Sequence, residues 1–541
     1  MDHRPEFSLE DGHAEPRQKM RLDRTIAPAL LVLVLWIFGG CASFPGGGGP
    51  TLEEKIEAVI LAEPLHQVHW GILVVDPDRG RVLYSRSSHR KFVPASNMKV
   101  LSTSTALSLL GPEYRFSTQI WGVGPFDPLT GILDGDLVVQ PSGDPTLSER
   151  FYPTAEAPLD SLALGLWRSG LRSVTGSLVV DVSRWDSTTV PDSWMVGNLP
   201  SRSAATGSAL SIGEGELVVE VTPGARIGDT AQARWWPQTE ADFFSVAFVT
   251  SHPDSSLSRD VFYRPEGRRL HLEGSVPLGT IDTLSVAQRD PEGVASWALR
   301  RAIEKKGISM GGDIRVVWSE GEPLGPGVCR SGRMTAVEEG PEDPSEMESP
   351  GPMLPHCVDA TPLAELSSPP MGEVVEAILE PSQNWMTEQL VHALGLELGE
   401  MGSWAEGFRV EQEFLTQEVG IDSLDIHYRD GSGLAAYNLV TPRAMVRILE
   451  YMRNSPHADL FRLAMAEPGE EDSTLRNRLP GLEGRLFAKT GTISHVNSLS
   501  GYLVSDGGRT LIFSVLTNGS GLPSSLVRQG IDRVVQIIAQ H

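Results

Sequence analysis

Two residues in the stretch VPASNMKVLSTSTALSLLG, residues 93–111, have the types and spacing of a catalytic pair. Ser96 precedes Lys99 by three positions, so on a helix the two side chains share a face and can hydrogen-bond. A serine hydroxyl becomes a good nucleophile only when a base removes its proton, and a lysine whose pKa is lowered by burial can be that base. Arginine stays charged and cannot do this. Because the chain has 38 arginines and only seven lysines, a lysine at this position indicates a nucleophile with its base.

Two further motifs lie far along the chain. The sequence SQN at 382–384 stands at the head of an expected helix, and KTG at 489–491 lies on an expected strand. A cation, a hydroxyl and a glycine that admits close approach suit the recognition of a carboxylate. The three motifs therefore offer a nucleophile, a base, further polar groups and an anion site.

Each motif taken alone also has a plainer interpretation. Ser96 and Ser382 could cap the N-termini of helices, and residues 489–491 could be an exposed edge strand. A second Ser-x-x-Lys, from Ser88 to Lys91, lies in a charged stretch that indicates a surface turn. The three motifs in this order favour the catalytic interpretation, because together they are the signature of the serine enzymes that react with penicillin.

The chain resembles the low-molecular-mass class C penicillin-binding proteins, the D-alanyl-D-alanine carboxypeptidase/endopeptidase family, from about Leu52 to the C-terminus. The resemblance is carried by stretches such as PASNMKVLSTSTAL, DGDLVVQPSGDPTLS, DGSGLAAYNLVTP and AKTGT. It implies an α/β (α+β) serine β-lactamase/DD-peptidase-like transpeptidase domain. It also implies peptidoglycan stem peptides as substrates, β-lactam antibiotics as inhibitors, and no metal or organic cofactor.

The resemblance implies roles for the residues of the first two motifs. Ser96 is the nucleophile that forms the acyl-enzyme, and Lys99 is its base. Ser382 passes a proton to the leaving amine, and Asn384 holds the substrate amide and the lysine. Gln383 replaces the aspartate that is common at the middle of this motif, and we expect a small effect because that side chain is not the acting group.

The third motif binds the end of the substrate in this family. The resemblance assigns Lys489 and Thr490 to the carboxylate of the terminal D-Ala, with Gly491 beside them. The backbone N–H groups of Ser96 and Thr492 are expected to form the oxyanion hole.

One segment departs from the family pattern. After DGSGL at 430–434 the family often has Ser-Arg, and here the chain has Ala435 and Ala436. The missing arginine leaves open how the side-chain carboxylate of the stem peptide is bound. We expect Asp430 and Gly431–Gly433 to shape a turn near the site without reacting.

Elements from both ends of the chain must bring these residues together. Residues 70–75 and 81–84 predict a hairpin with its turn at 76–80, and the stretch after Pro94 predicts a buried helix. Helices are expected at 371–379, 385–394 and 441–452, followed by three antiparallel strands and a C-terminal helix. We therefore expect a discontinuous domain of residues 52–113 and 362–541, with one sheet built from both termini.

The middle of the chain has a different sequence pattern. Between residues 114 and 361, short strand-like runs alternate with turn residues, and two helical segments interrupt them. We expect a β-rich insertion of two small nested domains, with an acidic, proline-rich loop at 336–355. Cys329 and Cys357 flank this loop and are candidates for a disulfide, or else two unrelated thiols.

The N-terminus indicates export. Residues 1–41 have the layout of a signal peptide, with Met20 as a candidate start, and small residues precede Cys41 as in a lipoprotein cleavage site. Simple cleavage and an uncleaved anchor are the alternatives. Residues 42–51 would then be a glycine-rich tether, and the expected location is periplasmic with a lipid anchor in the membrane. The net charge of −25 argues against nucleic acid as a partner.

The predicted function is that of a serine D-Ala-D-Ala carboxypeptidase, and the sequence leaves open whether it also acts as a DD-endopeptidase. A β-lactamase or an esterase would use the same chemistry, but those relatives lack the insertion. The alternative from another class is a catalytically silent peptidoglycan-binding or β-lactam-sensing protein. No metal site is expected, and His495 is expected in a strand.

Overall fold

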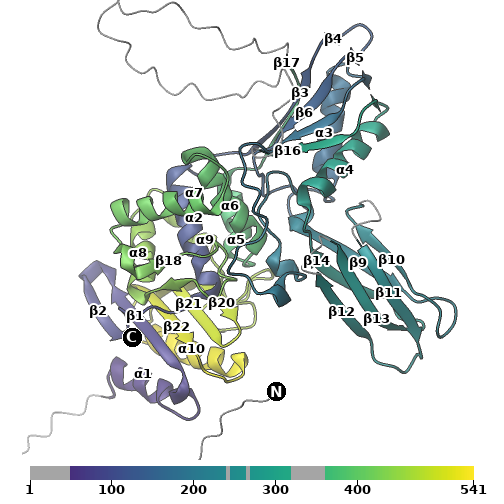
Figure 1. Ribbon diagram of the computed structural model, residues 1–541. Helices are drawn as coiled ribbons and strands as arrows, with labels where there is room; N and C mark the ends of the chain where they lie inside the picture. The colour runs from purple at the N-terminus through teal and green to yellow at the C-terminus, as the bar shows by residue number, and fades with distance from the viewer. Residues whose placement is uncertain (1–48, 239–243, 264–268, 319–359) are drawn as a thin grey trace, which may run out of the picture. The chain divides into compact units, whose positions relative to one another are not determined.

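The structure is a computed structural model that describes residues 49–238, 244–263, 269–318 and 360–541. Segments from both ends of this chain build one five-stranded antiparallel sheet, in the order β2-β1-β22-β21-β20 (Figure 1). Its strands are β1 (His69–Asp76), β2 (Arg81–Arg86), β20 (Leu486–Ile493), β21 (Val496–Val504) and β22 (Thr510–Asn518). The predicted hairpin and the sheet built from both termini are confirmed by this pairing.

Two terminal helices share a hydrophobic core with the sheet. They are α1 (Leu52–Ile60) and α10 (Ser524–Ala539), which contact each other. Helix α10 buries residues 527, 531, 534, 535 and 538, a spacing of three and four that gives one apolar helix face.

A second core surrounds helix α2 (Met98–Leu109). Every residue from Met98 to Leu107 is buried, as expected for a helix enclosed on all sides. The surrounding helices and the small sheet beside them are α5 (Met371–Leu379), α6 (Asn384–Leu398), α7 (Trp404–Glu413), α8 (Pro442–Arg453), α9 (Ala458–Leu463), β18 (Ile426–His427) and β19 (Leu439–Val440). Helix α2 packs against α6, and the 3-10 turn that precedes it packs against β20.

The inserted segment contains its own sheets and two separate hydrophobic cores. The first core lies between helices α3 (Ala157–Arg168) and α4 (Pro291–Lys305) and a five-stranded sheet in the order β16-β8-β6-β3-β17. The strands of this sheet are β3 (Ser117–Val123), β6 (Asp136–Gln140), β8 (Leu178–Asp181), β16 (Ile314–Val317) and β17 (Ala360–Ser367). A smaller sheet beside it contains β4 (Phe126–Asp127), β5 (Ile132–Leu133), β7 (Ser173–Val174) and β15 (Ser309–Met310).

The second core of the insertion lies between two three-stranded sheets. One sheet has the order β10-β9-β14, and the other has the order β11-β13-β12. The strands are β9 (Glu216–Thr222), β10 (Gln232–Trp236), β11 (Phe244–Ser251), β12 (Ser258–Tyr263), β13 (Leu270–Pro277) and β14 (Asp282–Ala287). The described chain therefore has the predicted mixed α/β class with a β-rich interruption.

Strand β17 crosses the expected boundary between residues 361 and 362. It pairs with β3, so residues 362–367 belong to the sheet of the insertion. The second segment of the discontinuous domain was expected to begin at Pro362, but this residue lies within β17, an edge strand whose register shifts between Pro362 and Ala364. A proline is tolerated at such a position because its missing N–H faces away from the ladder.

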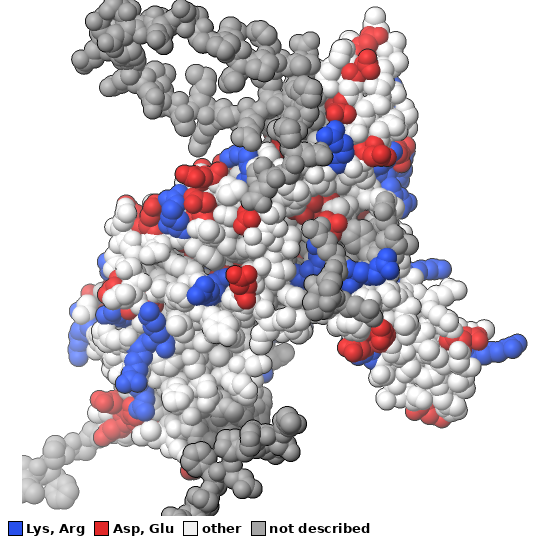
Figure 2. Space-filling view, viewed as in Figure 1, with Lys and Arg blue, Asp and Glu red and all other residues white. Residues whose placement is uncertain are grey.

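Several predictions fall outside the described residues. These are the signal peptide, Cys41, most of the tether, the acidic loop and the pair Cys329 and Cys357. Within the described ranges no helix is both long enough and apolar enough to cross a membrane. On the face shown in Figure 2, acidic and basic side chains are interspersed, without a continuous basic surface among the described residues.

Candidate active site

Ser96 lies in a short 3-10 turn, Ala95–Asn97, that leads into α2. Asn97 fastens this turn to the sheet, because its Nδ2 donates to the Lys489 carbonyl at 3.0 Å and to Ser498 Oγ at 2.8 Å. Ala95 has a φ of 49°, a left-handed conformation that costs free energy in residues other than glycine. Neither Ser96 nor Asn97 caps α2 through a side chain, so the interpretation of Ser96 as a helix cap is wrong.

Two glycines let the backbone approach this turn. A Cβ on Gly491 would lie 2.2 Å from Ser498 Oγ and 3.0 Å from the Ser96 nitrogen. A Cβ on Gly433, which has a φ of +84°, would lie 1.9 Å from the Ala95 carbonyl oxygen. Side chains at these two positions would push the nucleophile away from β20 and from the 430–435 segment.

Lys99 reaches the nucleophile from one turn further along. Its Nζ lies 3.1 Å from Ser96 Oγ, and it donates to Asn384 Oδ1 and to the Ser432 carbonyl, both at 2.7 Å. The side chain is fully buried. Burial lowers the pKa of Lys99 to about 7, against the opposing effect of nearby carboxylates, because the charged form is poorly solvated there. The lysine thus has the lowered pKa that a base requires.

Glu388 orients the segment that accepts a hydrogen bond from the lysine. It lies one turn after Asn384 on α6, and its two carboxylate oxygens accept from the backbone N–H groups of Gly431 and Ser432 at 3.0 and 2.9 Å. Trp404 Nε1 also donates to it at 2.8 Å. Burial raises the pKa of Glu388 to about 7. Sequence reasoning missed this residue, although its helical spacing from Asn384 was a usable signal.

Asp430 holds the rest of the same segment. Its carboxylate accepts from the backbone N–H groups of Gly433 and Ala435, from Asn438 Nδ2 and from Trp194 Nε1. The expectation that residues 430–433 shape a turn near the site is confirmed. Trp194 comes from the insertion, so the insertion helps to fix the loop that contacts the lysine.

Ser382 precedes α6 in a left-handed conformation, with a φ of 68°. The first turn of α6 has no side-chain cap, so the capping interpretation of this serine is wrong as well. Asn384 accepts from Lys99 and donates through Nδ2 to the Ser203 carbonyl of the insertion at 2.7 Å. Gln383 donates to Glu214, another residue of the insertion.

The KTG motif lies on β20, the edge strand of the main sheet. Lys489 is fully buried, and its Nζ donates to the Thr490 carbonyl at 3.0 Å. Burial, and then the charge of Lys99, lowers the pKa of Lys489 well below its usual range. Thr490 Oγ1 donates to Thr474 Oγ1 at 2.8 Å, and Thr492 Oγ1 to Asn497 Oδ1 at 3.4 Å.

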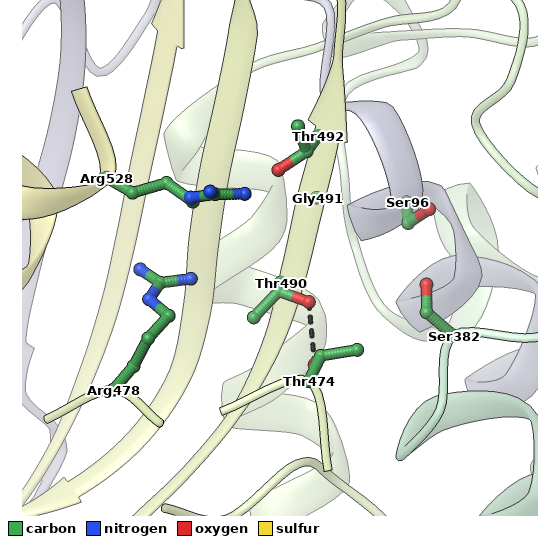
Figure 3. Close-up of a pocket in the computed structure, with 8 residues that line it drawn as sticks. All are labelled: Ser96, Ser382, Thr474, Arg478, Thr490, Gly491, Thr492 and Arg528. Atoms are coloured by element: carbon green, nitrogen blue, oxygen red, sulfur yellow. Dashed lines mark hydrogen bonds between the residues drawn. The ribbon is translucent and has the colours of Figure 1, made fainter. Parts of the chain in front are cut away.

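A pocket of about 320 Å³ opens between these motifs (Figure 3). It is lined by Ser96, Ser382, Thr474, Arg478, Thr490, Gly491, Thr492 and Arg528. The structure therefore brings all three motifs to one cavity. Residues Lys99, Asn384 and Lys489 of these motifs are not among those that line it. Thr474 and the two arginines were not predicted, because they come from segments without a recognisable motif.

The remaining residues considered in the sequence do not line the pocket. The Ser88 to Lys91 segment is a turn with an exposed lysine, as expected for the second Ser-x-x-Lys. His495 lies in the turn between β20 and β21 with a φ of 62° and not in a strand, because the two strands are joined by a tight reversal there. No group of three or more metal-ligating side chains occurs among the described residues.

Comparisons with known proteins agree with this geometry. The family model described as D-Ala-D-Ala carboxypeptidase 3 (S13) family matches residues 52–323 and 354–541. A D-alanyl-D-alanine carboxypeptidase of Actinomadura sp. (strain R39) is 30% identical over 528 residues, which cover 95% of this chain and 89% of the relative. The D-alanyl-D-alanine carboxypeptidase DacB of Haemophilus influenzae is 21% identical, covering 83% of this chain and 85% of its own length.

A solved structure has the same fold. The crystal structure of penicillin-binding protein 4 (dacB) from Haemophilus influenzae has a TM-score of 0.71 and 20% sequence identity, covering 90% of this chain and 99% of that one. The predicted DD-peptidase-like domain with inserted β-rich sheets is thereby confirmed. With its family model matched over most of its length, the chain belongs to the D-Ala-D-Ala carboxypeptidase 3 (S13) family.

Proposed function

We propose that this protein is an active serine D-Ala-D-Ala carboxypeptidase that hydrolyses peptidoglycan stem peptides through an acyl-enzyme on Ser96. One observation carries the proposal. The buried Lys99 Nζ lies 3.1 Å from Ser96 Oγ, and its pKa of about 7 leaves about half of the lysine neutral near pH 7. A general base is most effective when its pKa lies near the working pH.

Acylation then follows from the geometry of the pocket. Neutral Lys99 removes the proton from Ser96 Oγ, which attacks the carbonyl carbon of the penultimate D-Ala. The backbone N–H groups of Ser96 and Thr492 stabilise the negative oxygen of the tetrahedral intermediate, at about 3 kcal/mol per donor. The close approach of Gly491 to the Ser96 nitrogen supports this placement of the Ser96 turn beside β20.

Departure of the terminal D-Ala needs a proton on its amine. Ser382 lines the pocket with Ser96, and in Figure 3 its hydroxyl points toward the nucleophile, so it relays the proton that Lys99 took up. Asn384 keeps the ammonium of Lys99 in place during this transfer. Water then hydrolyses the ester of Ser96 and regenerates the enzyme.

The expected part of Lys489 at the substrate carboxylate stays a prediction. Its Nζ donates to the Thr490 carbonyl, so we also assign it to holding β20. The hydroxyls of Thr490 and Thr492 are the groups of this motif that line the pocket. Endopeptidase cleavage of cross-links uses the same acyl transfer and stays a prediction.

β-Lactams are proposed inhibitors, because a β-lactam carbonyl presents the same electrophile to Ser96. The structure of the Haemophilus influenzae relative in complex with a novel β-lactam, at 20% identity, has the same fold. We further propose export by residues 1–41, periplasmic location and lipidation of Cys41. Mass spectrometry of the membrane-extracted protein tests the lipid directly, since a processed chain without a lipid on its cysteine would contradict the anchor.

The first experiment is intact-protein mass spectrometry after mixing with benzylpenicillin, beside a Ser96→Ala control. One penicilloyl adduct on the wild type and none on the control would support the acyl-enzyme. No adduct on a folded wild type would favour the silent binding protein. An adduct combined with no release of D-Ala from a peptide ending in D-Ala-D-Ala would favour the β-lactam sensor.

A further inference from the structure

Ser382 depends on its backbone for its position in the pocket. Its hydroxyl points toward Ser96 (Figure 3), and its Oγ has no hydrogen-bond partner among the residues that the structure describes. Its φ of 68° costs free energy in a residue other than glycine and persists only where the surrounding structure holds it. The placement of this hydroxyl is therefore decided by the residues that follow it.

The next two residues are held by the insertion. Gln383 Nε2 donates to the carboxylate of Glu214, and Asn384 Nδ2 donates to the Ser203 carbonyl at 2.7 Å. Asn384 has a second tether, because its Oδ1 accepts from Lys99. The side chain of Gln383 has Glu214 as its single hydrogen-bond partner in the described chain, so its orientation depends on that carboxylate.

Glu214 is itself held in place. It lies in the tight turn Gly213–Gly215 and has a φ of 57°. Its other carboxylate oxygen accepts from Arg150 Nε at 2.7 Å. The turn also contacts α6 directly, since a Cβ on Gly215 would lie 2.8 Å from Cδ1 of Trp385, which is fully buried. The carboxylate that meets Gln383 therefore has little freedom to move.

We propose that Glu214 is a positioning residue for Ser382. Through Gln383 it holds the turn before α6 in which the serine hydroxyl faces the nucleophile, so the insertion takes part in the proton transfer to the leaving amine. This assignment rests on the proposed function and adds a requirement to it: residue 383 has to donate a hydrogen bond to a carboxylate. An acidic residue there, such as the aspartate that is common at this position, would face Glu214 with a like charge.

The test changes the charges of this pair. Gln383→Glu keeps the length of the side chain and places two carboxylates against each other. The double variant Glu214→Gln/Gln383→Glu restores one donor and one acceptor, with the direction of the hydrogen bond reversed. Glu214→Ala removes the acceptor altogether. The matched control is Asp282→Asn, which weakens an ion pair of the insertion, with Arg259 at 3.0 Å, that includes no residue of α6 or of the pocket lining.

The assay separates binding from chemistry. Each purified protein is mixed with benzylpenicillin at a series of concentrations and quenched rapidly, and intact mass gives the fraction acylated. Acylation joins Ser96 Oγ to the lactam carbonyl carbon and breaks the bond from that carbon to nitrogen, which takes up the proton through Ser382. The rate at saturating benzylpenicillin therefore reports the step that Ser382 serves, and the half-saturating concentration reports binding. The thermal midpoint of each variant reports folding.

We expect the loss to fall on the chemical step. Gln383→Glu should lower the saturating rate by roughly 10- to 100-fold, because a small displacement of a reacting group has effects of this size, and change the half-saturating concentration by less than about twofold. Glu214→Ala should lower the same rate by roughly 10-fold, as for the loss of a hydrogen bond to a charged group. The double variant should return to within about threefold of the wild type. Asp282→Asn should keep the wild-type rate, whatever its thermal midpoint.

Three results would overturn the assignment. They are a wild-type rate in Glu214→Ala, a double variant as slow as Gln383→Glu, and an equal loss of rate in Asp282→Asn. Should Gln383→Glu fail to fold, the rate of Glu214→Ala decides by itself. Each of these results needs a wild type that is acylated, so each leaves the proposed function standing. A folded wild type without an adduct would instead overturn the proposed function, and the role of Glu214 with it.

Discussion

The pKa of Lys99 predicts how acylation depends on pH. An ordinary lysine has a pKa of 10.5, and burial brings this one to about 7. The difference corresponds to a net destabilisation of the charged form by about 5 kcal/mol, at about 1.4 kcal/mol per unit, after the opposing effect of Glu388 and Asp430. At pH 7 about half of Lys99 is therefore neutral, whereas an ordinary lysine would be neutral in only about 0.03% of molecules.

The experiment varies the pH and follows the rate of acylation of Ser96. With a pKa of about 7, the neutral fraction is about 9% at pH 6 and about 91% at pH 8, so the rate of acylation of Ser96 should rise about tenfold between these values and then level off. The assay is rapid quenching after mixing with benzylpenicillin, followed by intact-mass measurement of the adduct from pH 5.5 to 9.5. Circular dichroism at each pH shows that the protein stays folded.

Two results would contradict the assignment of Lys99 as a base with a lowered pKa. A rate that is flat from pH 5.5 to 8 would mean that no base titrates there, so Lys99 does not accept the proton of Ser96. A rate that still rises tenfold per unit through pH 9 would mean that the base has an ordinary lysine pKa. Lys99→Arg should abolish acylation in a folded protein, since arginine stays charged, and a normal rate in that variant would also remove Lys99 as the base.

Four further substitutions, one of them a control, test the groups around the pair. Glu388→Gln removes a charge that raises the pKa of the base, so the midpoint of the acylation profile should move to lower pH, and an unchanged midpoint would contradict the coupling. Glu411 is fully buried, and burial raises its pKa to about 8. The folded state keeps a proton on Glu411 that the unfolded chain releases above pH 4.5, so the wild type loses stability from about pH 4.5 to 8. The thermal midpoint of Glu411→Gln should therefore exceed that of the wild type by an amount that grows over this pH range. A difference that stays constant with pH would contradict the raised pKa of Glu411. Gly433→Ala should slow acylation at least about tenfold, because its Cβ would lie 1.9 Å from the Ala95 carbonyl and displace the nucleophile. Gly481→Ala, with a φ of +87° and open space around it, should lose only about 1 kcal/mol of stability and keep its acylation rate.

Much of the fold could be predicted from the sequence because it depends on local patterns. The two short apolar runs at 70–75 and 81–84, joined by the turn residues 76–80, predict the hairpin, and the broad apolar face that starts at Met98 predicts a buried helix at α2. Pro362 shows the limit of such patterns. A proline is unfavourable inside a strand. The pairing of β17 with β3 shows that Pro362 lies on an edge strand, where a proline is tolerated.

Residue type and spacing are enough to recognise the chemistry of Ser96, Lys99 and the KTG residues. The tuning of that chemistry depends on how distant segments pack. The lowered pKa of the base is caused by burial, and Glu388 and Ser432 act on it through contacts between distant segments.

The same distinction separates the lysine of the KTG motif from the arginines. The resemblance assigned Lys489 to the substrate carboxylate, and this stays a prediction; the structure shows that its side chain is buried and that Arg478 and Arg528 line the pocket. Both arginines lie in segments without a motif, on the loop before β20 and on the last helix. A long-range arrangement of this kind has no signature in the local sequence, since it exists only once the sheet and its helices have packed.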